Sequence, residues 1–263
     1  MPLSSGMQYN LSVLIPAYNE IGSIAALLEL VKSALPEVAK ELIVVDDGST
    51  DGTREWLAEK FKITRESEMA GVAPAALNAE DFGPATAIKV IFHERNKGKG
   101  GAIQTALRAS TGEVIVVQDA DLEYDPADWG PMYDLIARRK VADVVYGSRF
   151  YGQPHRSLYY HHYLANRMIS VLFNVLFNQT LTDIEVCYKM FTREVLQTLN
   201  LTAVDFGIEV QISAQIALRR RWRIYEVAIR YFGRTYDEGK KINWKDGVKA
   251  LGYLVKYRLK PGN

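Results

Sequence analysis

Three acidic side chains, each two residues from the next, follow a short apolar run near the middle of the chain. Asp119, Ala120 and Asp121 come directly after the run VIVV, and Glu123 stands two residues further on. In an extended chain residues two apart point to the same side, so the two aspartates would face one space. Carboxylate oxygens suit Mg²⁺ or Mn²⁺, which keeps positions open for phosphate oxygens. The spacing indicates a divalent-metal site made by these three carboxylates; a polar turn that caps the next helix is the simpler alternative.

A second acidic pair, Asp46 and Asp47, follows the apolar run LIVV and precedes a predicted helix. Part of the segment DDGST is needed to cap that helix, but one side chain is enough for a cap. An acidic side chain at a strand end can also accept hydrogen bonds from a base N–H or from ribose hydroxyls. We therefore expect the pair to contact a nucleotide.

Cationic side chains follow two further apolar runs. Lys99 lies in NKGKGG, which has the composition of a phosphate loop but fits neither the ATPase nor the dinucleotide-binding motif. Its glycines would either let the backbone approach a ligand or simply start a helix. Arg149, in GSRF, can pair with a phosphate, with a carboxylate of the site, or in a structural salt bridge.

The elements that must position these residues alternate in type through the first half of the chain. Apolar, β-branched runs predict strands at residues 11–16, 42–45, 89–92, 114–117 and 143–146. Amphipathic segments predict helices at residues 23–34, 53–61, 100–109 and 126–139. This rhythm is typical of an α/β protein with an open, doubly wound, mostly parallel sheet of Rossmann-like type. Since parallel strands end at one edge of the sheet, all the polar clusters above should converge there.

The second half of the chain has a different pattern. Residues 157–178 form a long segment with one apolar helical face, which would pack on the core or lie at a membrane interface. Two further helices are expected at residues 192–199 and 206–219, followed by a basic, glycine-containing tail. Residues 62–87 look like a surface excursion to which we assign no chemistry.

Composition excludes several classes of protein. A formal net charge of +1 argues against a protein that coats nucleic acid, and we expect no nucleic-acid partner. The single cysteine, Cys187, cannot form an internal disulfide, which fits a reducing compartment. No secretory signal and no run of roughly 20 apolar residues is present. We expect a cytoplasmic protein that meets the cytoplasmic membrane face as a peripheral protein.

The ordered motifs PAYNE, VVDDGSTDGT, NKGKGGA, QDADLEYDP and YGSRF resemble those of glycosyltransferase family 2. The resemblance continues through TDIEVCYKMF, FGIEVQI and YFGRTYDEGKKINWKDG, and is strongest to the polyprenyl-phosphate sugar synthases of the dolichyl-phosphate mannose and glucose synthase type. It implies a GT-A fold, a nucleotide-sugar donor, transfer with inversion, and Mg²⁺ or Mn²⁺. The chain departs from the pattern in the long excursion, in Gln211 where an acidic residue is common, and in lacking a C-terminal transmembrane pair.

The resemblance also assigns roles to individual residues. Donor contacts are implied for the strand ends and the glycine segment, namely Pro16, Ala17, Tyr18, Glu20, Asp46, Asp47, Lys99, Asp119 and Ala120. Asp119 and Asp121 match the metal-binding DxD motif, with Glu123 as a further ligand. Arg149, Arg234 and Lys240 resemble the basic groups that hold the donor diphosphate and the acceptor phosphate. Residues 1–150 would then form the nucleotide-sugar-binding core, and residues 151–263 an acceptor-binding, membrane-facing extension of the same catalytic domain.

The acceptor determines which catalytic groups are needed. A polyprenyl phosphate is already anionic and needs cations to position it more than a base to deprotonate it. A soluble glycan or small alcohol would need a carboxylate base, for which Asp183, Glu185 and Glu209 are candidates. A catalytically silent binding module is disfavoured by the intact DxD motif and the basic tail. A sugar-nucleotide pyrophosphorylase is disfavoured because the chain lacks a glycine-rich loop ahead of the first helix.

Overall fold

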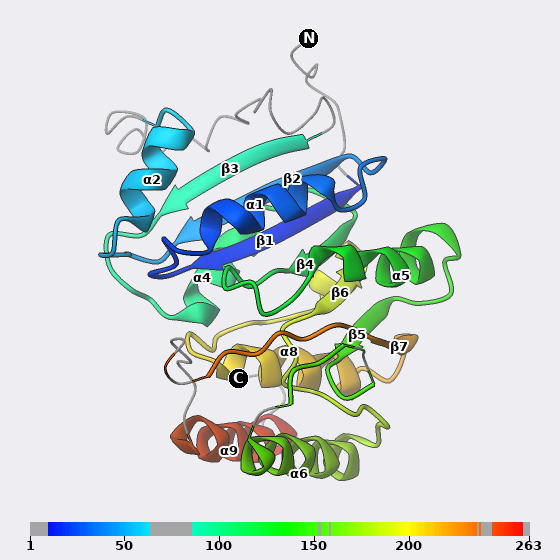
Figure 1. The fold of residues 1–263 in the computed structure, drawn as a ribbon. Coiled ribbons are helices and arrows are strands. Elements are labelled where there is room, and N and C mark those ends of the chain that lie inside the picture. Colours follow the sequence, from blue (N-terminus) through cyan, green and yellow to red (C-terminus); the bar gives the residue numbers. More distant parts are fainter. Residues whose placement is uncertain are drawn as a thin grey trace.

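The computed structural model describes residues 10–63, 86–151, 154–157, 159–235, 237 and 244–259. Its centre is a seven-stranded sheet in the order β3-β2-β1-β4-β6-β5-β7 (Figure 1). The strands are β1 (Leu11–Ala17), β2 (Lys40–Asp46), β3 (Thr86–Phe92), β4 (Val114–Val117), β5 (Val144–Ser148), β6 (Lys189–Thr192) and β7 (Ile224–Ala228). All five predicted strands are present, with ends that differ from the prediction by three residues or fewer.

The sheet is mostly parallel, as the sequence predicts. β3, β2, β1 and β4 run parallel to one another, and β7 runs parallel to β5. β6 is antiparallel to both of its neighbours, β4 and β5. Since β4 and β5 are each antiparallel to the same strand, they point in one direction. The carboxyl ends of all five predicted strands therefore lie at one edge of the sheet.

Helices cover both faces of the sheet, and three of them form a further layer beside it. The helices are α1 (Ile24–Ser33), α2 (Thr53–Lys60), α4 (Lys99–Ala109), α5 (Trp129–Tyr133), α6 (Tyr160–Phe177), α7 (Arg193–Leu196), α8 (Gly207–Leu218) and α9 (Trp244–Leu259). The predicted helix at residues 126–139 is a 3₁₀ turn, η2 (Pro126–Asp128), followed by α5 and a π-helical turn, η3 (Asp134–Arg138). Right-handed crossovers place α4 on the opposite face from α1, because the chain passes back across the sheet after β3.

Three helices from the second half of the chain form a layer at the β5 side of the sheet. α6 and α9 lie side by side, and α8 lies between them and the strands (Figure 1). α8 is buried on all sides from Gly207 to Ala217, which is the pattern of a helix inside a core rather than on a surface. In the part of the chain that is described, no helix is both long enough and apolar enough to cross a bilayer.

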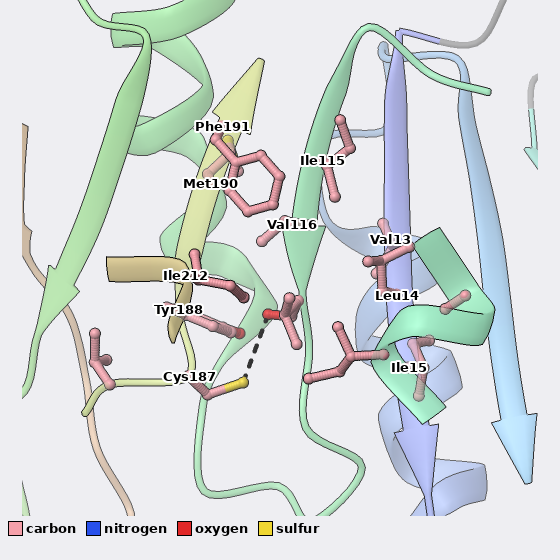
Figure 2. Packing of buried hydrophobic residues seen from close by; sticks show 14 of the residues in the cluster. Val13, Leu14, Ile15, Ile115, Val116, Cys187, Tyr188, Met190, Phe191 and Ile212 are labelled. Carbon is pink, nitrogen blue, oxygen red and sulfur yellow. Dashed lines mark hydrogen bonds between the residues drawn. The ribbon is translucent and has the colours of Figure 1, made fainter. Parts of the chain in front are cut away.

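The hydrophobic core is continuous from the first strand to this second layer (Figure 2). Val13 and Leu14 of β1 neighbour β4, which packs in turn beside Phe191 of β6 and Ile212 of α8. β1, β2 and β4 are buried almost throughout because both faces of the sheet are covered. The lone thiol of Cys187 is buried in this core, 3.8 Å from the Val117 carbonyl oxygen.

β6, β7 and α9 are not predicted by the sequence pattern. β6 has only four residues and begins with Lys189. A lysine at this position suggests a surface segment, but the Lys189 side chain is fully buried in an ion pair with Glu209 at 2.6 Å. β7 is partly exposed along its length and lacks a continuous apolar run. α9 lies in what looked like a basic tail. Most of the predicted surface excursion, from residue 64 to residue 85, lies outside the described residues.

Gln211, one of the departures from the family pattern, forms hydrogen bonds to the loop that precedes α8. Its side-chain oxygen accepts hydrogen bonds from the Thr202 and Ala203 N–H groups, both at 2.9 Å, and its amide nitrogen donates to the Thr202 hydroxyl at 3.0 Å. A carboxylate could accept the first two bonds but could not donate the third. The amide is therefore matched to a fully buried position that needs a donor and an acceptor.

We expect Gln211→Glu to lower the free energy of unfolding by about 1–3 kcal/mol, because the variant loses a donated bond and buries a charge. Urea denaturation at pH 8 measures this effect. Gln197→Glu, a change at the exposed end of α7, is the control and should be within about 0.5 kcal/mol of wild type. Equal stability of Gln211→Glu and wild type would contradict the assignment of donor and acceptor atoms.

Candidate active site

The carboxyl ends of the strands open into one large pocket with a volume of about 1440 Å³. The sequence-predicted residues that line it are Pro16, Ala17, Tyr18, Glu20, Asp47, Lys99, Asp119, Ala120, Asp121, Glu123, Arg149, Glu185, Glu209 and Arg234. Asp46 and Asp183 are fully buried next to lining residues. Lys240 lies outside the described residues. Residues that follow five strands, β1 to β5, and residues of the segment after β7 therefore meet at one site, as the topology requires.

Asp47 organises the glycine segment from inside the pocket wall. Its carboxylate accepts hydrogen bonds from the N–H groups of Lys97 at 2.9 Å and Gly98 at 2.8 Å, and it contacts His93 Nδ1 at 2.6 Å. Asp46 is different: burial raises its pKa, and its Oδ1 atom has no hydrogen-bond partner among the described residues. The two aspartates expected to contact a nucleotide thus have unequal environments, and Asp47 already has a structural task.

The glycines of NKGKGG accommodate another part of the protein. A Cβ atom on Gly98 would overlap the Val204 carbonyl oxygen, and one on Gly100 would overlap that of Ala203. Gly98 also has a φ of +84°, which a side chain would disfavour. α4 begins in this segment, as one of the two interpretations expected. The glycines therefore permit the close approach of another protein segment, the backbone of Ala203 and Val204 ahead of α8.

The acidic side chains after β4 are bound by two cations. Lys99 Nζ lies 2.8 Å from Asp119 Oδ1. Arg234 contacts Asp121 at 2.9 Å, Glu123 at 3.4 Å and Glu20 at 3.6 Å. Burial and the charges of Asp119 and Glu123 nevertheless raise the pKa of Asp121 to about 7, which the nearby Arg234 only partly opposes. The site therefore concentrates more negative charge than its own cations neutralise.

This set of oxygen donors fits a hard divalent cation, which would relieve the repulsion that raises the Asp121 pKa. Within the described ranges, no three His, Cys, Asp or Glu side chains are already grouped in a way that could hold a metal. Asp119 is engaged by Lys99, and Asp121 and Glu123 are engaged by Arg234. Any metal that binds here has to compete with these two side chains.

Arg149 and Asp183 form a bidentate ion pair at the end of β5. The distances are 2.6 Å from Nε to Oδ2 and 2.7 Å from Nη2 to Oδ1, and the Arg149 N–H also donates to Asp183 at 3.2 Å. Burial works to lower the Arg149 pKa, but Asp183 outweighs it and holds that pKa well above its usual value. Both carboxylate oxygens of Asp183 are thus committed to fixing a pocket cation.

The other two candidate bases have contrasting environments. Glu209 is engaged by Lys189 at 2.6 Å and lies 3.3 Å from Lys99. Glu185 lines the pocket, and burial, with the nearby Arg149 opposing it, raises its pKa to about 7. A carboxyl group with this pKa is suited to exchanging a proton near neutral pH.

The far half of the pocket is lined by α6, the start of α8 and α9. Ile169, Phe173 and Phe177 of α6 are buried in the core, so the core-packing interpretation of this segment is correct for one face. Another set of apolar side chains on these two helices is exposed to solvent: Tyr160, Tyr163, Leu164, Met168, Val171 and Val175 on α6, and Leu251, Val255 and Leu259 on α9. We call this set the apolar face. Tyr160, Tyr163, Met168 and Leu251 belong both to it and to the pocket lining, so the pocket opens onto it.

Tyr231 and Tyr253 are among the pocket residues that sequence reasoning missed. Tyr231 donates a hydrogen bond to Glu123 at 2.9 Å and lies beneath Arg149, whose guanidinium is 5.3 Å from its ring centroid. Tyr253 of α9 reaches Asp205 at the start of α8. Tyr231 stands three residues before Arg234 in a motif already singled out, which was an available signal. Tyr253 had none, because α9 was not predicted.

Comparison with known proteins agrees with this geometry. The family model of Glycosyl transferase family 2 matches residues 12–199. The chain is 28% identical over 208 residues to Glycosyltransferase AglJ of Haloferax volcanii, covering 79% of this chain and 58% of that protein. It is 25% identical over 267 residues to the Dolichyl-phosphate beta-glucosyltransferase of Dictyostelium discoideum, covering 95% of this chain and 74% of that protein. The chain thus spans somewhat more than half of the first relative and about three quarters of the second.

Among solved structures, glucosyl-3-phosphoglycerate synthase from Mycobacterium tuberculosis, in complex with Mn²⁺, uridine diphosphate and phosphoglyceric acid, has a TM-score of 0.64. Its sequence identity is 19%, and the match covers 96% of this chain and 79% of that one, which establishes a shared GT-A fold. The fold and the family are both consistent with a binding pocket at the carboxyl ends of the strands. The chain belongs to glycosyl transferase family 2.

Proposed function

We propose that this enzyme transfers a hexose, with inversion, from a uridine or guanosine diphosphate sugar to a polyprenyl phosphate such as a dolichyl or undecaprenyl phosphate. The observation that carries the proposal is a single pocket that runs from the carboxylates after β4 to the apolar face of α6 and α9. A nucleotide sugar suits the polar end of this pocket, and a lipid chain suits the end that opens onto exposed apolar side chains.

The donor end has groups for each part of a nucleotide diphosphate sugar. Pro16, Ala17 and Tyr18 form the wall at the end of β1, and Asp47, directly after β2, donates its backbone N–H to the Ala17 carbonyl at 2.8 Å. Asp119, Asp121 and Glu123 would hold Mg²⁺ or Mn²⁺, which when bound stabilises the charge on the departing diphosphate. Lys99 and Arg234 pair with those same carboxylates, which places both cations beside the expected position of the phosphates.

The acceptor end has cations and apolar surface but does not require a base. Arg149, Arg156 and Lys249 line the pocket together with Leu172 and Leu251. A phosphate monoester is anionic near neutral pH, so orienting its oxygen toward the anomeric carbon suffices for attack. The dolichyl-phosphate glucosyltransferases of Dictyostelium discoideum and Saccharomyces cerevisiae, the latter 26% identical over 268 residues, support the same acceptor class.

The apolar face would let the enzyme meet its acceptor at the cytoplasmic surface of a membrane as a peripheral protein. Val175 is 76% exposed and Leu259 is 75% exposed, and they belong to a set of exposed apolar side chains of the kind that marks a membrane or protein interaction site. Amphipathic helices that lie in a membrane interface expose apolar residues in this way.

The test supplies radiolabelled nucleotide hexoses with short polyprenyl phosphates in detergent or in anionic vesicles, and follows the label into the organic phase. We expect wild type to transfer label in both. Val175→Glu should lose most transfer in vesicles and little in detergent, while Leu30→Glu, at an exposed position of α1, serves as the control. Transfer only to a water-soluble hydroxyl acceptor would refute the lipid proposal and leave the family assignment intact.

A hydroxyl acceptor is the second candidate, and Glu185 favours it. A carboxyl group with a pKa of about 7 inside the pocket is suited to remove a proton from a hydroxyl. The Mycobacterium tuberculosis structural neighbour is named for glucosyl-3-phosphoglycerate, a product that is not a lipid.

Glu185→Gln separates the two acceptors. With a hydroxyl acceptor, we expect kcat to fall roughly 10²–10⁴-fold, because the general base is lost. Wild-type activity should also decline as the pH falls below about 7, when Glu185 becomes protonated. With a phosphate acceptor, the variant should keep most of its activity and the pH profile of wild type, because any limb near pH 7 would then come from Asp121, whose pKa is also about 7. Initial rates between pH 5.5 and 8.5 measure both effects.

A further inference from the structure

The loop from Asn200 to Phe206 joins α9 to the donor end of the pocket. On one side it presses against the glycine segment: Gly101 N–H donates to the Val204 carbonyl at 3.2 Å, and Gln104 Nε2 donates to that of Ala203 at 2.8 Å. Gly98 and Gly100 have no room for a Cβ atom against it. The loop and the glycine segment are therefore closely packed, and a shift of the loop would break these two hydrogen bonds.

The glycine segment in turn holds groups of the donor site. The Gly98 N–H donates to Asp47, and Lys99 Nζ contacts Asp119. Lys99 also lies 5.9 Å from the ring centroid of Phe206, at the end of the same loop. The loop thus contacts the glycine segment, which hydrogen-bonds to Asp47 and carries Lys99, the ion-pair partner of Asp119.

On its other side the loop is held by Tyr253 of α9. The Tyr253 hydroxyl lies 2.9 Å from Asp205 Oδ1 and 3.0 Å from Oδ2, and Asp205 also accepts the Gly207 N–H at 3.0 Å. The Tyr253 ring covers Gly207 so closely that a Cβ atom there would overlap it. One hydroxyl therefore fixes a carboxylate at the junction of the loop and α8.

We propose that Tyr253 is a positioning residue for donor binding: through Asp205 it holds the 200–206 loop against the glycine segment, and so keeps Asp47 and Lys99 in place. This inference rests on the proposed nucleotide-sugar donor. It assigns α9 a role at the polar end of the pocket in addition to its share of the apolar face. The predicted consequence is that loss of one hydroxyl on α9 weakens nucleotide binding across the pocket.

The experiment compares Tyr253→Phe with Tyr257→Phe. Tyr257 stacks on Tyr253 with ring centroids 5.7 Å apart, and its buried hydroxyl has no hydrogen-bond partner among the described residues. The control removes the same atom from the same helix without touching Asp205. Calorimetry with Mn²⁺ and either uridine or guanosine diphosphate gives the nucleotide Kd, initial rates give the acceptor KM, and hydrogen exchange reports on the amides of residues 97–102.

We expect Tyr253→Phe to raise the nucleotide Kd roughly three- to tenfold, within the range known for coupled positions. It should also speed exchange at residues 97–102 and leave the acceptor KM within about twofold. Tyr257→Phe should match wild type in all three. An unchanged Kd in Tyr253→Phe, or a change confined to the acceptor KM, would overturn the proposal. If neither nucleotide binds wild type, the proposed function fails, and unchanged exchange in Tyr253→Phe would separately refute the mechanical link.

Discussion

Asp121→Asn should abolish most of the transferase activity while making the metal-free protein more stable. The carboxylate is a proposed metal ligand, and removing one electrostatic stabiliser of a departing group lowers kcat by roughly 10²–10³-fold. The same carboxylate lies near Asp119 and Glu123 in a buried site, which raises its pKa to about 7. The variant removes this repulsion along with the ligand. Function and stability should therefore change in opposite directions, as is common at sites selected for binding.

The pH dependence follows from the direction of the shift. Because the folded pKa is above the unfolded one, the folded state binds the proton more tightly, and stability is lost as the pH rises from about 4 to 7. Asn does not titrate, so the stability advantage of the variant should grow over this window. It should reach roughly 1–4 kcal/mol at pH 8 in the absence of metal.

Thermal unfolding with and without Mn²⁺ measures both halves of this prediction. Wild type should gain stability on adding Mn²⁺ with nucleotide, and Asp121→Asn should gain little. Asp143→Asn is the control, because Asp143 also pairs with an arginine, Arg223 at 2.6 Å, but on the outer surface. Wild-type turnover in Asp121→Asn, with metal still required, would refute the role of this carboxylate.

The strands and the site positions could be predicted because they depend on local patterns. β1, β2 and β4 are buried on both faces, so each is a continuous apolar run that needs no knowledge of its neighbours. The polar residues that follow these runs then share an edge by topology alone. Asp119, Asp121 and Arg149 line one pocket for this reason.

The pairings within the site could not be predicted, because they join segments that are distant in sequence. Lys189 looks exposed by its type, yet it is buried because Glu209, 20 residues away, compensates its charge. The glycines of NKGKGG left open whether they approach a ligand or start a helix, and the loop that they accommodate lies about a hundred residues later in the chain. The assignment of residues 1–150 and 151–263 to donor and acceptor functions stays a prediction, although β6 and β7 from the second range complete the sheet.

Arg234→Ala should impair transfer far more than it impairs nucleotide binding. Arg234 is held by Asp121, Glu123 and Glu20, at the centre of the carboxylates that surround the proposed metal position. The Arg234 guanidinium can exchange its carboxylate partners for a phosphate when a metal binds the aspartates, because carboxylates and phosphates both accept bidentate hydrogen bonds from a planar guanidinium. We expect kcat to fall roughly 10²–10³-fold and the nucleoside diphosphate Kd to rise less than tenfold. Lys240→Ala, outside the described residues, should act in the same direction.

The metal gives an independent test of this exchange. If Arg234 competes with the metal for Asp121 and Glu123, its removal should strengthen Mn²⁺ binding in the absence of nucleotide, even though the enzyme becomes nearly inactive. Arg234→Lys keeps a charge but not the fork, and should fall between wild type and Arg234→Ala in both properties. Electron paramagnetic resonance of free Mn²⁺ measures the affinity directly, without any turnover. Weaker Mn²⁺ binding in Arg234→Ala would contradict competition and would mean that the arginine holds the carboxylates in position to bind the metal. Normal transfer by the same variant would mean that the segment after β7 has only a structural role.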